Sequence, residues 1–102
     1  MKLPVDEHII QLADLFKILG DASRLRIVLC CLGGPVSVGD IAQHLGLSSS
    51  LVSHHLRLLR GARVVKVERR GKQMFYSACD SHIECVIEDM LAHVSEPIEE
   101  VS

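Results

Sequence analysis

Apolar residues recur at intervals of three and four along most of the chain, which is the spacing of one buried face of an α-helix. This pattern predicts helices over residues 6–19, 22–32, 38–45 and 80–95, and one more from the serines at 48–50 to about residue 60. In chain order, glycines and small polar residues separate the first four of these segments, up to the one that ends near residue 60. Such residues are typical of the places where helices end and begin. The chain is therefore expected to be mainly helical.

The third and fourth predicted helices are joined by a short turn containing Gly46, which is a helix-turn-helix pattern. Ser37 and Asp40 have the spacing of a capping box at the start of the third helix, with Asp in place of Glu. Ser48 is expected to cap the fourth helix, as Asp21 is expected to cap the second. The residues expected to face inward from the fourth helix are Leu51, Val52, Leu56 and Leu59.

After Gly61 the apolar residues alternate with polar ones, which is typical of β-strands. Residues 64–69 and 73–77 alternate in this way, with the basic segment 70–72 between them, and this predicts a β-hairpin with a basic tip. A hairpin that follows a helix-turn-helix is a wing. The predicted fold class is thus mainly α with a small β-hairpin, a winged helix-turn-helix in one domain over residues 1–102.

Composition limits the kinds of protein that this chain can be. It is 48% hydrophobic but only 3% aromatic, so the expected core is aliphatic. It has no apolar run of membrane-spanning length and no apolar signal region near residue 1, so we expect a cytoplasmic protein that does not bind membranes. Its four cysteines are then expected to be thiols. Neither a nucleophile–base pair nor a phosphate loop is evident, so we expect no enzyme.

The net charge of −2 conceals a strong separation of charge along the chain. Residues 45–78 contain seven Lys and Arg against Glu68 alone, whereas residues 79–102 contain seven Asp and Glu and neither Lys nor Arg. The basic segment has the charge needed to meet DNA phosphates. The alternative is a solvated surface whose charge is merely uneven.

In the DNA-binding interpretation the fourth helix enters the major groove of double-stranded DNA. The residues expected to meet base edges are Ser49, Ser50, Ser53 and His54. The residues expected to serve phosphates or the minor groove are Arg57, Arg60, Arg69, Arg70 and Lys72. His55 is either a packed polar residue or a further contact.

Four possible metal ligands mark the last predicted helix: Asp80, His82, His93 and Glu96. Eleven residues turn an α-helix through about 1100°, so the two histidines share a face but lie about 16 Å apart along the axis. One ion cannot reach both pairs in one straight helix, but it could if a second copy packed antiparallel. Two imidazoles and two carboxylates suit Zn(II); Co(II) would fit the same set, and Ni(II) would prefer more ligands. The alternative is an exposed polar stripe.

Taken together, these stretches resemble the ArsR/SmtB winged-helix repressors, in particular their zinc sensors. The supporting segments are residues 15–27, 37–42, 47–56 and 70–76, followed by the ligand pattern of the last helix. The resemblance implies a homodimer built by the first and last helices. It also implies two equivalent metal sites, each with Asp80 and His82 from one subunit and His93 and Glu96 from the other. Metal binding would then weaken operator binding and release transcription.

The same family also uses a pair of cysteines at positions that are Ser37 and Gly39 here, so that second site is absent. Some relatives instead sense sulfur species or oxidants through one cysteine in the second helix and one in the last. The alternative function is therefore a thiol-based repressor that uses Cys30 or Cys31 with Cys85. Against it stands the interpretation of these cysteines as small apolar residues of the core.

Overall fold

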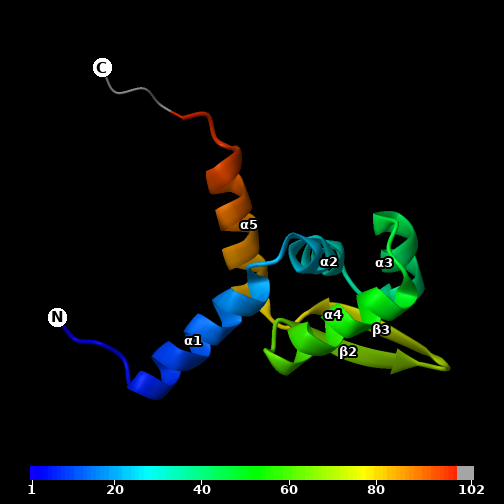
Figure 1. The fold of residues 1–102 in the computed structure, drawn as a ribbon, viewed down its shortest axis with the longest axis horizontal. Helices are drawn as coiled ribbons and strands as arrows, with labels where there is room; N and C mark the ends of the chain where they lie inside the picture. The colour runs from blue at the N-terminus through cyan, green and yellow to red at the C-terminus, as the bar shows by residue number, and fades with distance from the viewer. Residues whose placement is uncertain (99–102) are drawn as a thin grey trace.

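The computed structural model describes residues 1–98 and contains five helices and a small antiparallel sheet (Figure 1). The helices are α1 (Asp6–Leu19), α2 (Ala22–Leu32), α3 (Val38–Leu45), α4 (Ser49–Gly61) and α5 (Ser81–Ser95). The strands are β1 (Val36–Ser37), β2 (Val65–Arg70) and β3 (Gln73–Ala78). Every predicted helix and both strands of the predicted hairpin are confirmed to within a residue or two, and β1 is additional.

Helices α2 to α5 begin where polar side chains satisfy free backbone N–H groups, whereas α1 has no side-chain cap. Each expected N-cap accepts a hydrogen bond from the N–H three residues later, at 2.9–3.1 Å. The pairs of acceptor and donor are Asp21 with Arg24, Ser37 with Asp40, and Ser48 with Leu51. Gly46 ends α3 in a left-handed conformation, with φ of 67°, and so turns the chain directly into α4.

The sheet has the strand order β1-β3-β2. In the hairpin Val67 pairs with Tyr76 and Glu68 pairs with Phe75, and on the other edge of β3 Val36 also pairs with Tyr76. The two residues of β1 are too few to show a period of two, so only the pairing across the fold reveals this strand. It ties the start of α3 to the wing.

The core lies where α2, α3, α4 and the sheet meet. Its fully buried side chains include Ile27, Val28, Ile41, Val52, Leu56, Leu59 and Val64. The prediction that Leu51 faces inward is wrong, because its side chain is 39% exposed. Leu51 lies about 100° around α4 from Val52 and so falls outside the buried face.

Helices α1 and α5 lie at the end of the molecule away from α3 and the tip of the hairpin (Figure 1). Each carries an apolar stripe that this single chain leaves uncovered: Phe16 is 54% exposed, Met90 54% and Val94 72%. Only Leu19 in α1 and Ile87 in α5 are buried. Within residues 1–98 no helix combines the length and the apolarity needed to cross a membrane.

Candidate DNA interface and metal centre

One face of α4 carries all six residues that were predicted on it as DNA contacts. At about 100° per residue these residues span roughly 140° of the helix, opposite the core-facing side. Five of the six side chains are exposed and Ser53 is half-buried. The set comprises Ser49, Ser50, Ser53, His54, Arg57 and Arg60. Since Ser48 serves as the cap, the first turn of the helix presents serine hydroxyls and free backbone N–H groups together.

Two histidines that are adjacent in sequence have opposite environments on α4. His54 is exposed, whereas His55 is only 9% exposed and its Nδ1 has no hydrogen-bond partner among the described residues. Their ring centroids lie 5.9 Å apart. Burial therefore resolves the two interpretations of His55 in favour of a packed residue.

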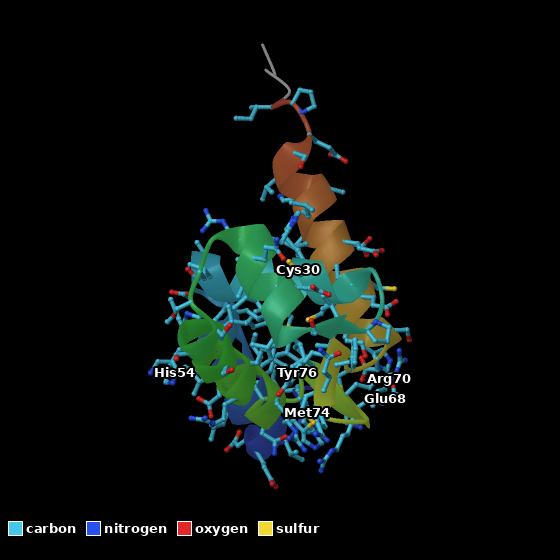
Figure 2. The ribbon with its side chains drawn as sticks, turned by 90° about the vertical axis from the view of Figure 1, so that its right-hand side faces the viewer. Cys30, His54, Glu68, Arg70, Met74 and Tyr76 are labelled. Atoms are coloured by element: carbon cyan, nitrogen blue, oxygen red, sulfur yellow. The ribbon has the colours of Figure 1, made fainter. Side chains whose placement is uncertain are left out.

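The hairpin adds a second basic surface beside α4. Figure 2 shows His54 on one side, Glu68 and Arg70 on the other, and Met74 and Tyr76 between them. The turn at the tip is made possible by Gly71, which has a positive φ of 63°. Arg69, Arg70 and Lys72 are all exposed around it.

The guanidinium groups of the wing are held by neighbours in the hairpin. Arg70 forms an ion pair with Glu68 at 3.3 Å, and its guanidinium carbon lies 5.1 Å from the centre of the Phe75 ring. Arg69 donates from Nε to the carbonyl of Gly71 at 3.1 Å. The role of Glu68 and Phe75 is absent from the sequence prediction, although Glu68 and Arg70 are two residues apart and must share a face of a strand.

Asp80 and His82 come together at the N-terminus of α5. Asp80 is the N-cap rather than the first helical residue, and its Oδ1 accepts from the Ile83 N–H at 3.0 Å. Its Oδ2 faces His82, with 3.6 Å between Oδ2 and Nδ1. The Ile83 N–H, helped by the charge of His82, holds the pKa of Asp80 below its ordinary value. This carboxylate is therefore ionised at neutral pH and keeps one oxygen free to bind a cation.

His93 and Glu96 lie at the opposite end of the same helix, and both are exposed. Glu96 is the C-cap residue of α5. Within residues 1–98 no three His, Cys, Asp or Glu side chains converge as a metal site. The chain thus brings together one half of the predicted ligand set, and it holds the other half about 16 Å away along the helix.

The cysteines differ in exposure and acidity. Burial raises the pKa of Cys30, and burial with Cys30 alongside raises the pKa of Cys31 to about 12. Both therefore stay protonated at neutral pH, and thiols are poor nucleophiles. Cys85 on α5 is exposed. These environments suit small core residues in α2 better than a reactive thiol pair.

Comparison with known proteins identifies a regulatory family whose match includes the helix-turn-helix. The profile of the family described as "Bacterial regulatory protein, arsR family" matches residues 21–67, from the cap of α2 into β2. The chain is 37% identical over 86 residues to a transcriptional repressor SmtB homolog from Synechocystis sp., covering 84% of this chain and 65% of that protein. It is 35% identical over 85 residues to a cadmium resistance transcriptional regulatory protein CadC homolog from Staphylococcus aureus, covering 82% of this chain and 70% of the relative.

This chain thus spans about two thirds of the length of these relatives. Among solved structures, a homodimeric winged helix-turn-helix DNA-binding domain from Mycobacterium bovis superposes with a TM-score of 0.86 at 22% identity. That alignment covers all of this chain and 97% of the other. The predicted winged helix-turn-helix fold is therefore confirmed.

Proposed function

The chain belongs to the arsR family of bacterial regulatory proteins, and on this basis we propose that it is a dimeric transcriptional repressor that leaves operator DNA when it binds zinc. The observation that carries the metal part of this proposal is the Asp80–His82 pair, with 3.6 Å between Oδ2 and Nδ1. It stands beside an apolar helix face that a single chain leaves uncovered. The relatives are transcriptional regulators, one of them named for cadmium resistance.

Double-stranded DNA is the partner that the basic surface fits. The exposed face of α4 offers hydroxyl, imidazole and guanidinium groups, which bind base edges and phosphates. In the proposed complex Ser49, Ser50, Ser53 and His54 lie in the major groove. The residues proposed to hold the backbone on either side are Arg57, Arg60, Arg69, Arg70 and Lys72.

A second copy of the chain is the proposed cover for α1 and α5. Their exposed stripes include Phe16, Met90 and Val94, which a monomer would leave in water at a cost of roughly 25 cal/mol per Å². An antiparallel pair of α5 helices would also bring the N-terminus of one α5 to the C-terminus of the other. Dimerisation and completion of the ligand set are thus served by one arrangement.

The donor set fits a zinc ion. Asp80 and His82 of one protomer and His93 and Glu96 of the other would supply two carboxylate oxygens and two imidazole nitrogens, which suits tetrahedral Zn(II). The free Oδ2 of Asp80 and the exposed ring of His82 are available without breaking the cap. When bound, the ion supplies a cross-link between the two α5 helices. Co(II) is expected to fit the same donors and Ni(II) less well.

Ligation changes DNA affinity only if the ligands meet differently in the DNA-bound and free dimers. The α5 pair sets how the two α4 helices are spaced, because α5 contacts β3 and β3 contacts the core around α4. Metal ligands that hold the two α5 helices at one crossing angle therefore favour a single distance between the two α4 helices. The proposed repressor has its lowest DNA affinity at that spacing.

Operator binding with and without zinc tests this function. DNA from the promoter region next to the gene that encodes the chain would be titrated by fluorescence anisotropy, with EDTA or with Zn(II). Zinc is expected to raise the Kd of the wild-type protein at least tenfold, whereas His93→Ala should bind the DNA normally and ignore zinc.

His8→Ala is the matched control, because His8 is an exposed histidine on α1 outside the ligand set. It should respond to zinc like the wild type. Equal Kd values with and without zinc for the wild type would contradict metal sensing. A zinc response that persists in His93→Ala would contradict the proposed ligand set but not metal sensing itself.

A further inference from the structure

The wing contains an ion pair whose removal should make the protein bind DNA of any sequence more tightly. We propose that Glu68 is a positioning residue that holds Arg70 on the wing and so limits binding to DNA of arbitrary sequence. The proposal rests on the DNA-binding part of the proposed function. It does not depend on the metal site.

The register of the hairpin places the three participants on one surface. Glu68 pairs directly with Phe75, so these two side chains lie on the same face of the sheet. Arg70 is two residues beyond Glu68 and is the diagonal neighbour of Phe75. Val65, which is almost fully buried, is on the opposite face. The three side chains therefore form a small cluster on the side of the wing away from the core.

Each neighbour holds a different part of Arg70. Glu68 accepts from a terminal guanidinium nitrogen at 3.3 Å, which occupies the group that would bind a phosphate. Phe75 lies under the guanidinium carbon at 5.1 Å, which fits a cation–π contact. The ion pair is open to solvent, because the two side chains are 54% and 60% exposed. A DNA phosphate can therefore reach Arg70 and compete with the carboxylate.

Glu68 is the residue that can offset positive charge in the basic segment of the chain. It is the one acidic residue among residues 45–78, which otherwise carry seven Lys and Arg. Arg69 is held differently, because its Nε donates to the backbone carbonyl of Gly71. A carbonyl has no net charge, so the positive charge of Arg69 is not neutralised. Within the wing, Glu68 thus offsets one guanidinium and leaves Arg69 and Lys72 uncompensated.

Two consequences follow for DNA binding. Arg70 must exchange a carboxylate for a phosphate, and the freed carboxylate then stays close to the DNA backbone. Both effects oppose binding at every DNA sequence, whereas base contacts from α4 favour binding only at the operator. Glu68 therefore weakens binding through the DNA backbone, at the operator and elsewhere alike, and leaves the base contacts unchanged.

The test measures how the full chain binds a 30-base-pair duplex of mixed sequence, by fluorescence anisotropy at several salt concentrations. Glu68→Gln should lower the Kd by roughly three- to tenfold for a dimer at low salt, in line with the weak energies of exposed ion pairs. The dependence of log Kd on log salt should steepen, by up to about 0.9 for each extra phosphate contact. Glu84→Gln on α5 is the matched control, since it removes the same charge from an exposed site far along the chain.

Combining the substitutions separates a local role from a general charge effect. In an Arg70→Ala background, Glu68→Gln should have no larger effect than Glu84→Gln, because Glu68 acts through Arg70. Glu68→Gln that matches Glu84→Gln in the wild-type background would overturn the proposal. The proposal would also be overturned if Glu68→Gln raised DNA affinity by the same factor in the Arg70→Ala background as in the wild type. Failure of the wild-type protein to bind any duplex would instead contradict the proposed function.

Discussion

At the scale of single residues, burial separates two neighbours with the same side chain. His54 lies on the outer face of α4, while His55 is packed and its Nδ1 has no hydrogen-bond partner within residues 1–98. A buried polar atom without a partner costs about 1–3 kcal/mol. His55 is therefore expected to destabilise the core, whereas His54 is exposed and is proposed to contact DNA.

His55→Leu should raise the free energy of unfolding by about 1 kcal/mol, because an apolar side chain of similar size removes the unpaired nitrogen. Urea denaturation followed by circular dichroism would measure the change. His54→Leu is the control: it should leave stability nearly constant and weaken DNA binding. If His55→Leu instead weakened DNA binding and left stability unchanged, His55 would be a DNA contact.

At the scale of elements, α4 ends in a way that its glycine does not reveal. Gly61 is the last helical residue, and the left-handed residue that ends the helix is Arg63, with φ of 59°. The Val64 N–H bonds to the Leu59 carbonyl at 2.9 Å, and the Arg63 N–H to the Arg60 carbonyl at 3.0 Å. This is the Schellman arrangement, which usually has glycine at the position of Arg63.

Arg63→Gly should therefore stabilise the protein by about 0.5–1 kcal/mol, because a left-handed conformation costs a residue with a Cβ atom roughly 1–2 kcal/mol and glycine very little. The same urea experiment would measure it. Arg60→Gly removes an equal charge inside α4 and should destabilise by up to about 1 kcal/mol. Loss of stability in both variants would show that the Arg63 side chain contributes more than its backbone costs.

At the scale of the whole molecule, the end formed by α1 and α5 is the surface through which we propose that two copies pair. Val94→Asp should raise the dimer Kd at least about a hundredfold, because an unpaired charge in an apolar interface costs about 3 kcal/mol or more. Light scattering after gel filtration, over a range of concentrations, would show the smaller mass. Leu51→Asp changes an exposed leucine of α4 in the same way and should stay dimeric. A wild-type monomer at every concentration would contradict the dimer.

The sequence by itself determined the features that depend on near neighbours. The helices, their caps at Asp21, Ser37 and Ser48, and the basic hairpin follow from spacings of two to four residues, over which side chains meet whatever the rest of the fold does. The separation of basic and acidic segments is likewise visible in the printed chain.

Only the tertiary structure decided which distant residues meet. The pairing of β1 with β3 and the burial of His55 depend on how elements far apart in sequence pack. The cluster of Arg70, Glu68 and Phe75 depends on the register of the hairpin. The ligand pattern shows the same division. Spacing alone marked Asp80 and His82, and the cap geometry then oriented the free carboxylate oxygen toward the imidazole. Their proposed union with His93 and Glu96 depends on a second chain, because one helix holds the two pairs about 16 Å apart.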